Sequence, residues 1–366
     1  MNRRIEELRS WMEAEAVDIT FIHSPENVFY LTNFLTDPHE RLMGLFVFRD
    51  KEPFFICPGM ETGQAADAGF KDEIIGYGDH ENPFQKIEEA LNSRGLGTIQ
   101  KAAIESELLS YARAEAFRNI SGSPRLVSAE EKMNELRVVK DQKEISIMEK
   151  AAALADFGVE TGVAALREGV SEMDVLAKIE YELKRKGAQA MSFSTMVLFG
   201  KKSGQPHGNP GTAVLKKGDL VLFDLGVVLD GYCSDITRTV MYGEPDDQQK
   251  AIYETVLKAE MAALEAAKPG TRIGDLDKIA RGIIEEAGYG EFFPHRLGHG
   301  LGINVHEFPS MAHTNDGLLK EGMTFTIEPG IYIPEIGGVR IEDDVVITEN
   351  GAQTLTSYPK ELQIIK

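Results

Sequence analysis

The part of the chain after about residue 130 contains two similar segments, and this repeat restricts the possible folds more than any other feature. The segments REGVSEMDVLAKIEYELKRKG (167–187) and KPGTRIGDLDKIARGIIEEAG (268–288) match at a spacing of 101 residues, as in 270−169. The matched residues are Gly169 with Gly270, Asp174 with Asp275 and Gly187 with Gly288. Both segments end in glycine, a common residue just after a helix. We interpret the repeat as two copies of one unit, with chance similarity as the alternative.

Two apolar stretches that follow these segments are also alike, and both carry acidic residues. KGDLVLFDLG (217–226) aligns with EGMTFTIEPG (321–330), which places Asp224 on Glu328 (328−224 = 104). After a short connection, GYCSD (231–235) aligns with GVRIE (338–342), which places Asp235 on Glu342 (342−235 = 107). Carboxylates are poor strand residues. Two matched pairs of them in or beside apolar strands therefore favour duplication over chance.

The four carboxylates need a compensating partner if their strands are buried. A buried carboxylate must be protonated, paired or bound to a metal. If a pseudo-twofold axis relates the halves, the four groups meet at one point, where they repel one another unless cations neutralise them. Duplicated carboxylate pairs can supply both bridging and terminal oxygens to two divalent ions. His299, among the glycines of HRLGHGLG, offers a nitrogen ligand.

Two further histidines precede the carboxylate blocks, one in each half. They are His207 in GQPHGNPG and His306 in NVHE. A single histidine more often has a structural role. Several histidines beside an acidic cluster instead favour a functional site.

The first 125 or so residues predict a separate α/β domain, because short apolar runs such as DITFIH, GLFVF, PFFIC and AAIES alternate with helix-like segments. Gly122 and Pro124 interrupt the pattern before a long helix expected from near Met133. We therefore predict domains at 1–128 and 129–366.

The composition excludes several classes of partner and location. A formal net charge of −20 disfavours a nucleic-acid-binding surface, which needs clustered Lys and Arg. We expect no membrane association, because no apolar run approaches the roughly 20 residues that span a bilayer. The two cysteines form no CxxC pair, which fits a reducing compartment and predicts a cytoplasmic protein.

The combination of Asp224, Asp235, His299, Glu328 and Glu342 resembles the ligand set of the pita-bread metallopeptidases, which include methionine aminopeptidase, aminopeptidase P and prolidase. The first 125 or so residues resemble the creatinase-type domain that methionine aminopeptidases lack. The resemblance implies an α/β N-terminal domain plus an α+β pita-bread C-terminal domain with an internal pseudo-twofold duplication. It also implies a proline-directed peptidase.

The resemblance further implies a role for each residue of the site. Asp224 would bind one metal ion, His299 and Glu328 the other, and Asp235 and Glu342 both. Manganese would be the usual metal, with cobalt or zinc as substitutes, and the pair of ions would activate a water molecule. Glu328 would also carry a proton, while His207 and His306 would steady the substrate and the oxyanion. Arg340 would order a bridging carboxylate or the substrate, with a supporting salt bridge as the alternative.

Two stretches favour a prolidase, which cleaves Xaa-Pro dipeptides, over aminopeptidase P, which cleaves longer peptides. TDPHERL (36–42), with His39 and Arg41, resembles the prolidase loop that covers the partner subunit's site, which implies a homodimer; a solvated charged turn is the alternative. Arg296, three residues before His299, could bind the terminal carboxylate of a dipeptide. A non-catalytic or metal-free relative is disfavoured, because all five ligand positions are filled.

Overall fold

The computed structural model describes residues 3–366, which form two compact units that divide between Arg137 and Val138. The predicted first domain ends at residue 128, so the first unit extends nine residues further (137−128). Helix α6 (Glu130–Val138) occupies this stretch.

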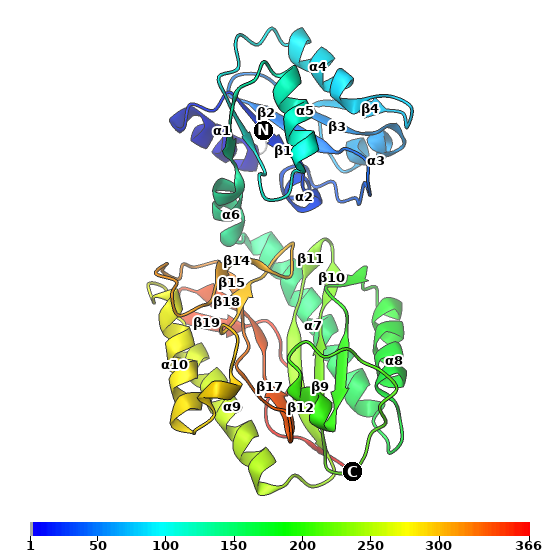
Figure 1. Ribbon diagram of the computed structural model, residues 1–366, viewed down its shortest axis with the longest axis vertical. Coiled ribbons are helices and arrows are strands. Elements are labelled where there is room, and N and C mark those ends of the chain that lie inside the picture. The colour runs from blue at the N-terminus through cyan, green and yellow to red at the C-terminus, as the bar shows by residue number, and fades with distance from the viewer. Residues whose placement is uncertain (1–2) are drawn as a thin grey trace. The chain divides into compact units, whose positions relative to one another are not determined.

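The first unit contains a six-stranded mixed sheet in the order β4-β3-β2-β1-β5-β6, with helices around it (Figure 1). The four predicted apolar runs form β1, β2, β3 and β5, so the predicted α/β character is confirmed. Continuous apolar runs suit strands that are covered on both faces. Phe46 lies at the centre of the core, and its ring stacks on Phe21 and Phe54 at centroid distances of 4.4 and 4.6 Å. The elements before α6 are α1 (Arg3–Ala14), β1 (Ile19–Ile22), α2 (Pro25–Thr32), β2 (Gly44–Phe48), β3 (Phe54–Pro58), η1 (Gly59–Glu61), α3 (Thr62–Asp67), β4 (Glu73–Tyr77), α4 (Pro83–Ser93), β5 (Lys101–Ile104), α5 (Tyr111–Ile120) and β6 (Arg125–Ser128).

The second unit repeats one order of elements twice: two helices, then an antiparallel strand pair, which is β9 with β12 in the first half and β15 with β18 in the second. In Figure 1, α8 lies to the right of these strands, α9 and α10 lie to the left, and α7 runs behind them. The first half consists of α7 (Gln142–Ala164), α8 (Glu172–Arg185), β7 (Ala190–Met191), β8 (Met196–Phe199), η2 (Gly200–Gly204), β9 (Asp219–Leu225), β10 (Val227–Leu229), β11 (Tyr232–Cys233) and β12 (Ile236–Tyr242). The second half consists of α9 (Asp247–Ala266), α10 (Ile273–Glu286), η3 (Gly290–Phe292), β13 (His299–Gly300), β14 (Glu307–Ser310), β15 (Thr324–Ile327), β16 (Gly330–Ile333), β17 (Gly337–Arg340), β18 (Asp343–Thr348) and β19 (Gly351–Thr354). Strand β20 (Ile364–Ile365) then pairs in parallel with β12 of the first half.

Strand β9 shows why an acidic residue can follow an apolar run. Val221, Phe223 and Leu225 pack in the hydrophobic cluster of helices α7 and α8. Successive side chains of a strand point to opposite faces, so Asp224 lies on the other face. The apolar residues of β9 are therefore buried, while Asp224 faces the space between the two halves.

The long helix predicted from near Met133 is wrong in one respect, because α6 ends at Val138 and α7 begins at Gln142. The Asp141 side chain accepts hydrogen bonds from the Lys143 and Glu144 amides, and the Glu144 side chain accepts one from the Asp141 amide. This capping box fixes a new helix start. Val139, in the gap, forms an isolated bridge with Met323.

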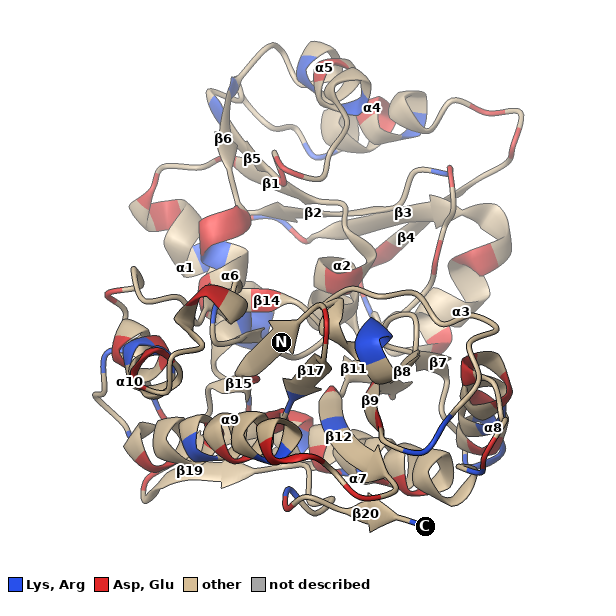
Figure 2. Cartoon of the chain, turned by 60° about the horizontal axis from the view of Figure 1, so that its bottom comes forward, with Lys and Arg blue, Asp and Glu red and all other residues tan. Residues whose placement is uncertain are grey.

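Lys and Arg are interspersed with Asp and Glu along α8, α9 and α10 (Figure 2). Within residues 3–366, no helix combines the length and apolar character that a bilayer crossing requires. Cys57 and Cys233 are buried, and no disulfide joins them. The cytoplasmic location stays a prediction.

Candidate active site

The four repeated carboxylates lie at corresponding ends of the two strand pairs. In the first half, Asp224 is paired with Thr237 near the end of the β9–β12 ladder, and Asp235 immediately precedes β12. In the second half, Glu328 immediately follows β15 and Glu342 immediately precedes β18. Each antiparallel pair thus presents two carboxylates from the same end.

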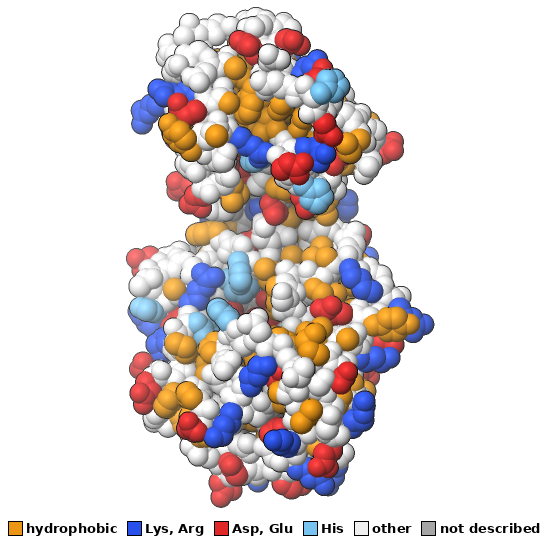
Figure 3. Space-filling model, turned by 45° about the vertical axis from the view of Figure 1, so that its right-hand side comes forward, with side chains coloured by type: hydrophobic (Ala, Val, Ile, Leu, Met, Phe, Trp, Pro, Cys, Tyr) orange, Lys and Arg blue, Asp and Glu red, His pale blue; other side chains and the backbone are white. Residues whose placement is uncertain are grey.

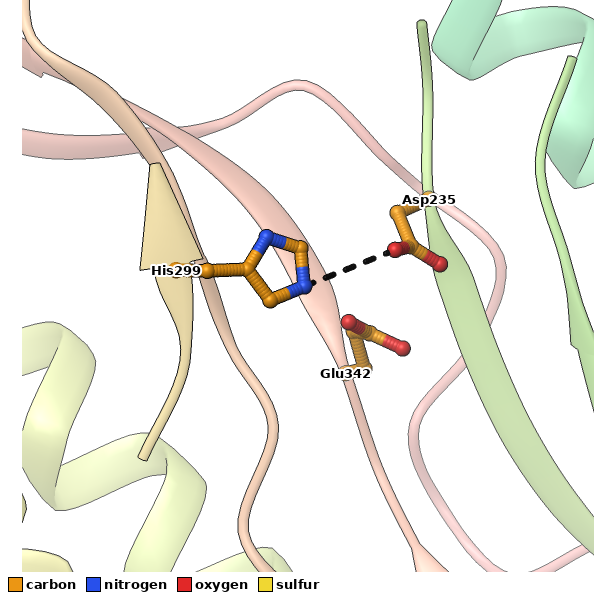
Figure 4. A group of neighbouring side chains, drawn as sticks. All are labelled: Asp235, His299 and Glu342. Atoms are coloured by element: carbon orange, nitrogen blue, oxygen red, sulfur yellow. Dashed lines mark ion pairs between the residues drawn. The ribbon is translucent and has the colours of Figure 1, made fainter. Parts of the chain in front are cut away.

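These ends converge with His299 into one buried cluster. Ligand atoms of Asp235, His299 and Glu342 all lie within 4.8 Å of one another (Figure 4). His299 Nε2 is 3.8 Å from Asp235 Oδ2 and 3.2 Å from Glu328 Oε1. Asp235 Oδ1 is buried and has no hydrogen-bond partner among residues 3–366.

Glycines let the backbone carrying His299 approach its neighbours, as the sequence suggested. A Cβ atom on Gly298 would lie 2.0 Å from the Thr326 carbonyl oxygen, and one on Gly300 would lie 2.2 Å from that of Phe308. Any larger residue at either position would push His299 away from the carboxylates, because those contacts are with backbone.

The electrostatics of the cluster are those of a site that needs cations. Burial raises the pKa of Asp235 well above its ordinary value, and the neighbouring Glu342 and Asp224 charges raise it further. Burial likewise raises the pKa of Glu342, with the Glu328 and Asp224 charges adding to it. Burial also raises the pKa of Glu328, but the hydrogen bond and charge of His299 outweigh it and lower that pKa to about 2. Divalent cations would relieve this repulsion.

The types of donor atom in the cluster are therefore suited to binding metal ions. It combines carboxylate oxygens, one of them buried without a partner, with an imidazole nitrogen. Carboxylate oxygen and imidazole are ligands that suit Mn²⁺, Co²⁺ and Zn²⁺.

Each half supports the ligands of the other through hydrogen bonds. Thr237 Oγ1, on β12, donates to Glu342 Oε2 at 2.5 Å. Asp344, on β18, accepts a hydrogen bond from the Asp235 amide at 2.9 Å. Such outer contacts orient ligands, so neither half can form the cluster by itself.

Arg340 is buried against Asp224 and forms an ion pair with it. Its Nε donates to Thr237 Oγ1 at 2.9 Å and its Nη1 to Tyr332 Oη at 2.8 Å. Asp224 is not one of the two predicted bridging carboxylates, so this contact corresponds to the supporting salt bridge among the predicted alternatives, and the role of Arg340 toward the substrate stays a prediction. The Asp224 atom in this ion pair is Oδ2.

A cavity of about 370 Å³ opens beside the cluster. It is lined by all five predicted ligands and by Phe193, Met196, Pro206, His207, His295, Arg296, His306, Tyr332 and Arg340. Several histidine side chains lie near one another on the face of the second unit, in the lower part of Figure 3. The structure thus brings the predicted ligands, His207, His306, Arg296 and Arg340 together.

The predicted substrate contacts differ in their environments. The His306 ring packs edge-on against His299 at a centroid distance of 4.2 Å, and burial followed by the His299 charge lowers the His306 pKa. His207 is exposed at the cavity. Arg296 is also exposed, and its Nη1 donates to Ser310 Oγ at 3.1 Å.

His295 and Tyr332 line the same cavity, and sequence reasoning missed both. His295 Nε2 lies 2.8 Å from Tyr332 Oη, which also accepts from Arg340. Burial lowers the pKa of His295 and raises that of Tyr332 to about 12. Alternation along the strand GIYI (330–333) could have identified Tyr332, because Ile331 faces the core and the next residue therefore faces the opposite way. His295 is the first residue of HRLGHGLG, four residues before His299.

His39 and Arg41 belong to the first unit. His39 is exposed, with Nδ1 3.4 Å from Asp37 Oδ2. Arg41 forms a two-pronged pair with Asp79, with Nε–Oδ1 at 2.8 Å and Nη2–Oδ2 at 3.2 Å. Their substrate contacts stay predictions.

Comparison with known proteins identifies both units. The sequence pattern of metallopeptidase family M24 matches residues 146–349, and that of the creatinase/prolidase N-terminal domain matches residues 4–139. A Bacillus subtilis (strain 168) protein named "Putative dipeptidase YkvY" is 65% identical over 362 residues, which cover 99% of each chain.

Solved structures agree with this assignment. The prolidase from Pyrococcus horikoshii OT3 is 37% identical, with a TM-score of 0.90 over 99% of this chain and 100% of that one. The Xaa-Pro dipeptidase from Bacillus anthracis is 35% identical, with a TM-score of 0.92 over 99% of each chain. The predicted fold class is thereby confirmed. The chain is a peptidase that belongs to metallopeptidase family M24, in the prolidase branch that carries a creatinase-type N-terminal domain.

Proposed function

We propose that the protein is a dinuclear metal-dependent dipeptidase that hydrolyses the Xaa-Pro imide bond. The observation that carries this proposal is the convergence of two repeated carboxylate pairs and His299 beside one cavity. Similarity to a prolidase and to an Xaa-Pro dipeptidase over nearly the whole chain supports a dipeptide substrate.

Asp224, Asp235, His299, Glu328 and Glu342 would hold two divalent ions. We propose manganese, with cobalt or zinc as substitutes, because a mostly oxygen donor set with one imidazole suits these metals. When bound, such ions lower the pKa of a coordinated water to about 7 and polarise a carbonyl group.

The residues of the chain position the substrate and move the proton. Arg340 and Tyr332 hold Asp224 in place, and Thr326 donates to Glu328 Oε1 at 3.1 Å. Glu328 would carry a proton to the imide nitrogen of the leaving proline. Burial favours the neutral form of His306, which keeps one N–H to donate to the developing oxyanion.

The substrate class follows from the rim of the cavity. The exposed guanidinium of Arg296 would bind the free carboxylate of a dipeptide. Proline lacks an N–H, so an enzyme that grips extended backbone handles it poorly, whereas this site acts on the carbonyl. We further propose a cytoplasmic homodimer in which His39 and Arg41 complete the partner's site.

The test is hydrolysis of Xaa-Pro dipeptides and of Xaa-Pro-containing tripeptides by manganese-loaded protein. We expect about two ions per chain, cleavage of dipeptides only, and loss of cleavage on chelation. Efficient tripeptide cleavage would replace the dipeptidase by an aminopeptidase P. A metal-loaded protein inert toward both substrates would overturn both functions. Full activity in a monomer would remove the role of His39 and Arg41 across subunits.

A further inference from the structure

Outside the ligand cluster, a fully buried carboxylate joins both ends of the segment that carries His207. Glu172 is the first residue of α8 and is 0% exposed. Its Oε1 accepts from the Phe199 amide at 3.0 Å, and its Oε2 accepts from the Gly211 amide at 2.7 Å. These two amides bracket residues 200–210, so one side chain closes the segment at both ends.

This segment, residues 200–210, forms part of the cavity wall. Pro206 and His207 line the cavity, and the His207 side chain is exposed there. Two short turns shape the backbone on either side, with Gln205 N bonded to Lys202 O and Gly208 N to Gln205 O, both at 3.0 Å. The direction of His207 therefore depends on where this backbone is held.

The chemistry of the anchor requires a carboxylate. Lys202 Nζ also donates to Glu172 Oε2, at 2.5 Å, so three donors meet two oxygens. A buried carboxylate is stable only with such partners, and charge-assisted hydrogen bonds are stronger than neutral ones. A glutamine of the same shape would place its NH₂ group against either the Phe199 amide or the Gly211 amide and Lys202, and two donors cannot bond to each other.

The second half fixes its own cavity segment in a similar way. Asp277, on α10, is 0% exposed and accepts from the Leu297 amide at 2.9 Å. Arg281 pairs with Asp277 and donates to the carbonyl oxygens of Phe293 and His295, at 3.0 and 2.8 Å. At the repeat spacing of 101, Glu172 aligns with residue 273, so Asp277 lies four residues further on (277−273). Helices α8 and α10 therefore each hold a cavity segment with a buried carboxylate, but the carboxylates stand at different positions of the repeat.

We propose that Glu172 is a positioning residue, which sets His207 against the substrate by holding both ends of residues 200–210. The proposal rests on the proposed function for the identity of the substrate and for the contact of His207 with it. The first turn of α8 would then help to determine the position of a substrate-contacting side chain.

The first experiment measures hydrogen–deuterium exchange of the metal-loaded protein. Glu172→Gln removes one set of acceptors and is expected to speed exchange across residues 199–211. The matched control is Ser171→Ala, which removes the α8 N-cap, where Ser171 Oγ accepts from the Asp174 amide, but touches neither anchored amide. Equal exchange across residues 199–211 in Glu172→Gln and the wild type would overturn the proposal, as would equal acceleration in Ser171→Ala.

The second experiment is a double-mutant cycle on Xaa-Pro dipeptide hydrolysis. Glu172→Gln should lower kcat/KM by about 10- to 100-fold through a small displacement of His207, with unchanged metal content. If it acts through His207, it should cost little more in a His207→Ala background. If the fold-losses in kcat/KM of the two single variants multiply in the double variant, the proposal is wrong.

The two readouts also separate this proposal from the proposed function. A wild type inactive toward Xaa-Pro dipeptides defeats the proposed function, while the exchange measurement still tests Glu172. If Glu172→Gln does not fold, Glu172→Asp keeps the charge but is one carbon atom shorter, which withdraws its oxygens from the Phe199 and Gly211 amides. It should also speed exchange within residues 199–211, and no rise there would overturn the proposal.

Discussion

The two halves of the second unit supply corresponding carboxylates to one site, but the residues that follow these carboxylates in β12 and β18 are stabilised by different kinds of contact. Behind Asp235 in the first half, β12 begins with Ile236, which packs in the apolar cluster of α7 and α8. Behind Glu342 in the second half, β18 begins with Asp343, which pairs with buried Arg238 and with Lys360. Lys360 also pairs with Glu260 at 2.8 Å. A duplicated fold can thus keep its ligands while one support is apolar and the other ionic.

The largest expected effect tests whether the halves are equivalent at the ligands. Asp235→Ala and Glu342→Ala should each reduce bound metal below two ions per chain. Each should lower kcat/KM by at least about 10³-fold, because several kcal/mol of transition-state stabilisation are lost. Metal analysis and Xaa-Pro dipeptide kinetics measure both. If only one variant loses activity, the halves are not equivalent.

The next effect compares the two supports by stability. Arg238→Met removes a buried guanidinium that donates to Asp343 and to the Tyr358 carbonyl, both at 2.7 Å. Breaking a buried ionic network by removing one partner should lower the free energy of unfolding by about 3–5 kcal/mol. The apolar control, Ile236→Val, should cost only about 0.5–1.5 kcal/mol. Denaturant unfolding measures both, and equal costs would contradict the contrast between the supports.

A smaller effect compares two threonines that orient ligands. Thr237 bonds Glu342 of the other half at 2.5 Å and accepts from the charged Arg340, whereas Thr326 bonds Glu328 of its own half at 3.1 Å. Thr237→Val should therefore weaken metal binding toward the upper end of a 10- to 100-fold range, and Thr326→Val toward the lower end. Titration of metal-free protein with Mn²⁺ measures both. The reverse order would show that support between the halves is the weaker kind.

The last comparison concerns the pH dependence of the ionic support alone. Burial, followed by the charge of Asp343, raises the pKa of Glu260 to about 8. Because this exceeds its unfolded value of 4.5, the folded state holds a proton that the unfolded state has released, so this group's contribution to stability falls as pH rises from about 4.5 to 8. Glu260→Gln should flatten that decline in the free energy of unfolding. The exposed Glu265→Gln on the same helix should leave it unchanged; an unchanged slope in Glu260→Gln would contradict the assignment.

The parts of the site that the sequence predicted are those with a local signal. Asp224 and Glu328 interrupt or end apolar strands, and the repeat adds Asp235 and Glu342. The apolar runs of the first unit predicted its strands for the same reason, since periodicity is a property of neighbouring residues.

The parts that escaped prediction depend on distant contacts. Arg238 and Asp343 are 105 residues apart in the chain, and nothing near either predicts their pairing. Tyr332 meets Arg340 and His295 only because β16 and β17 pair and η3 leads back toward them. The break between α6 and α7 was missed for a different reason: a capping aspartate overrode a sequence that is otherwise helical on both sides.

The contacts of Arg238 with the carbonyl oxygens of Tyr358 and Pro359 make the support behind Glu342 depend on residues that follow every predicted ligand in the chain. Lys360, whose ammonium group neutralises Asp343, and strand β20, which pairs with β12, belong to the same stretch. A shortened chain without residues 358–365 would therefore keep all five predicted ligands and lose the partners of Arg238 and Asp343. Proteolytic clipping of this stretch would damage the site without removing a single residue from it.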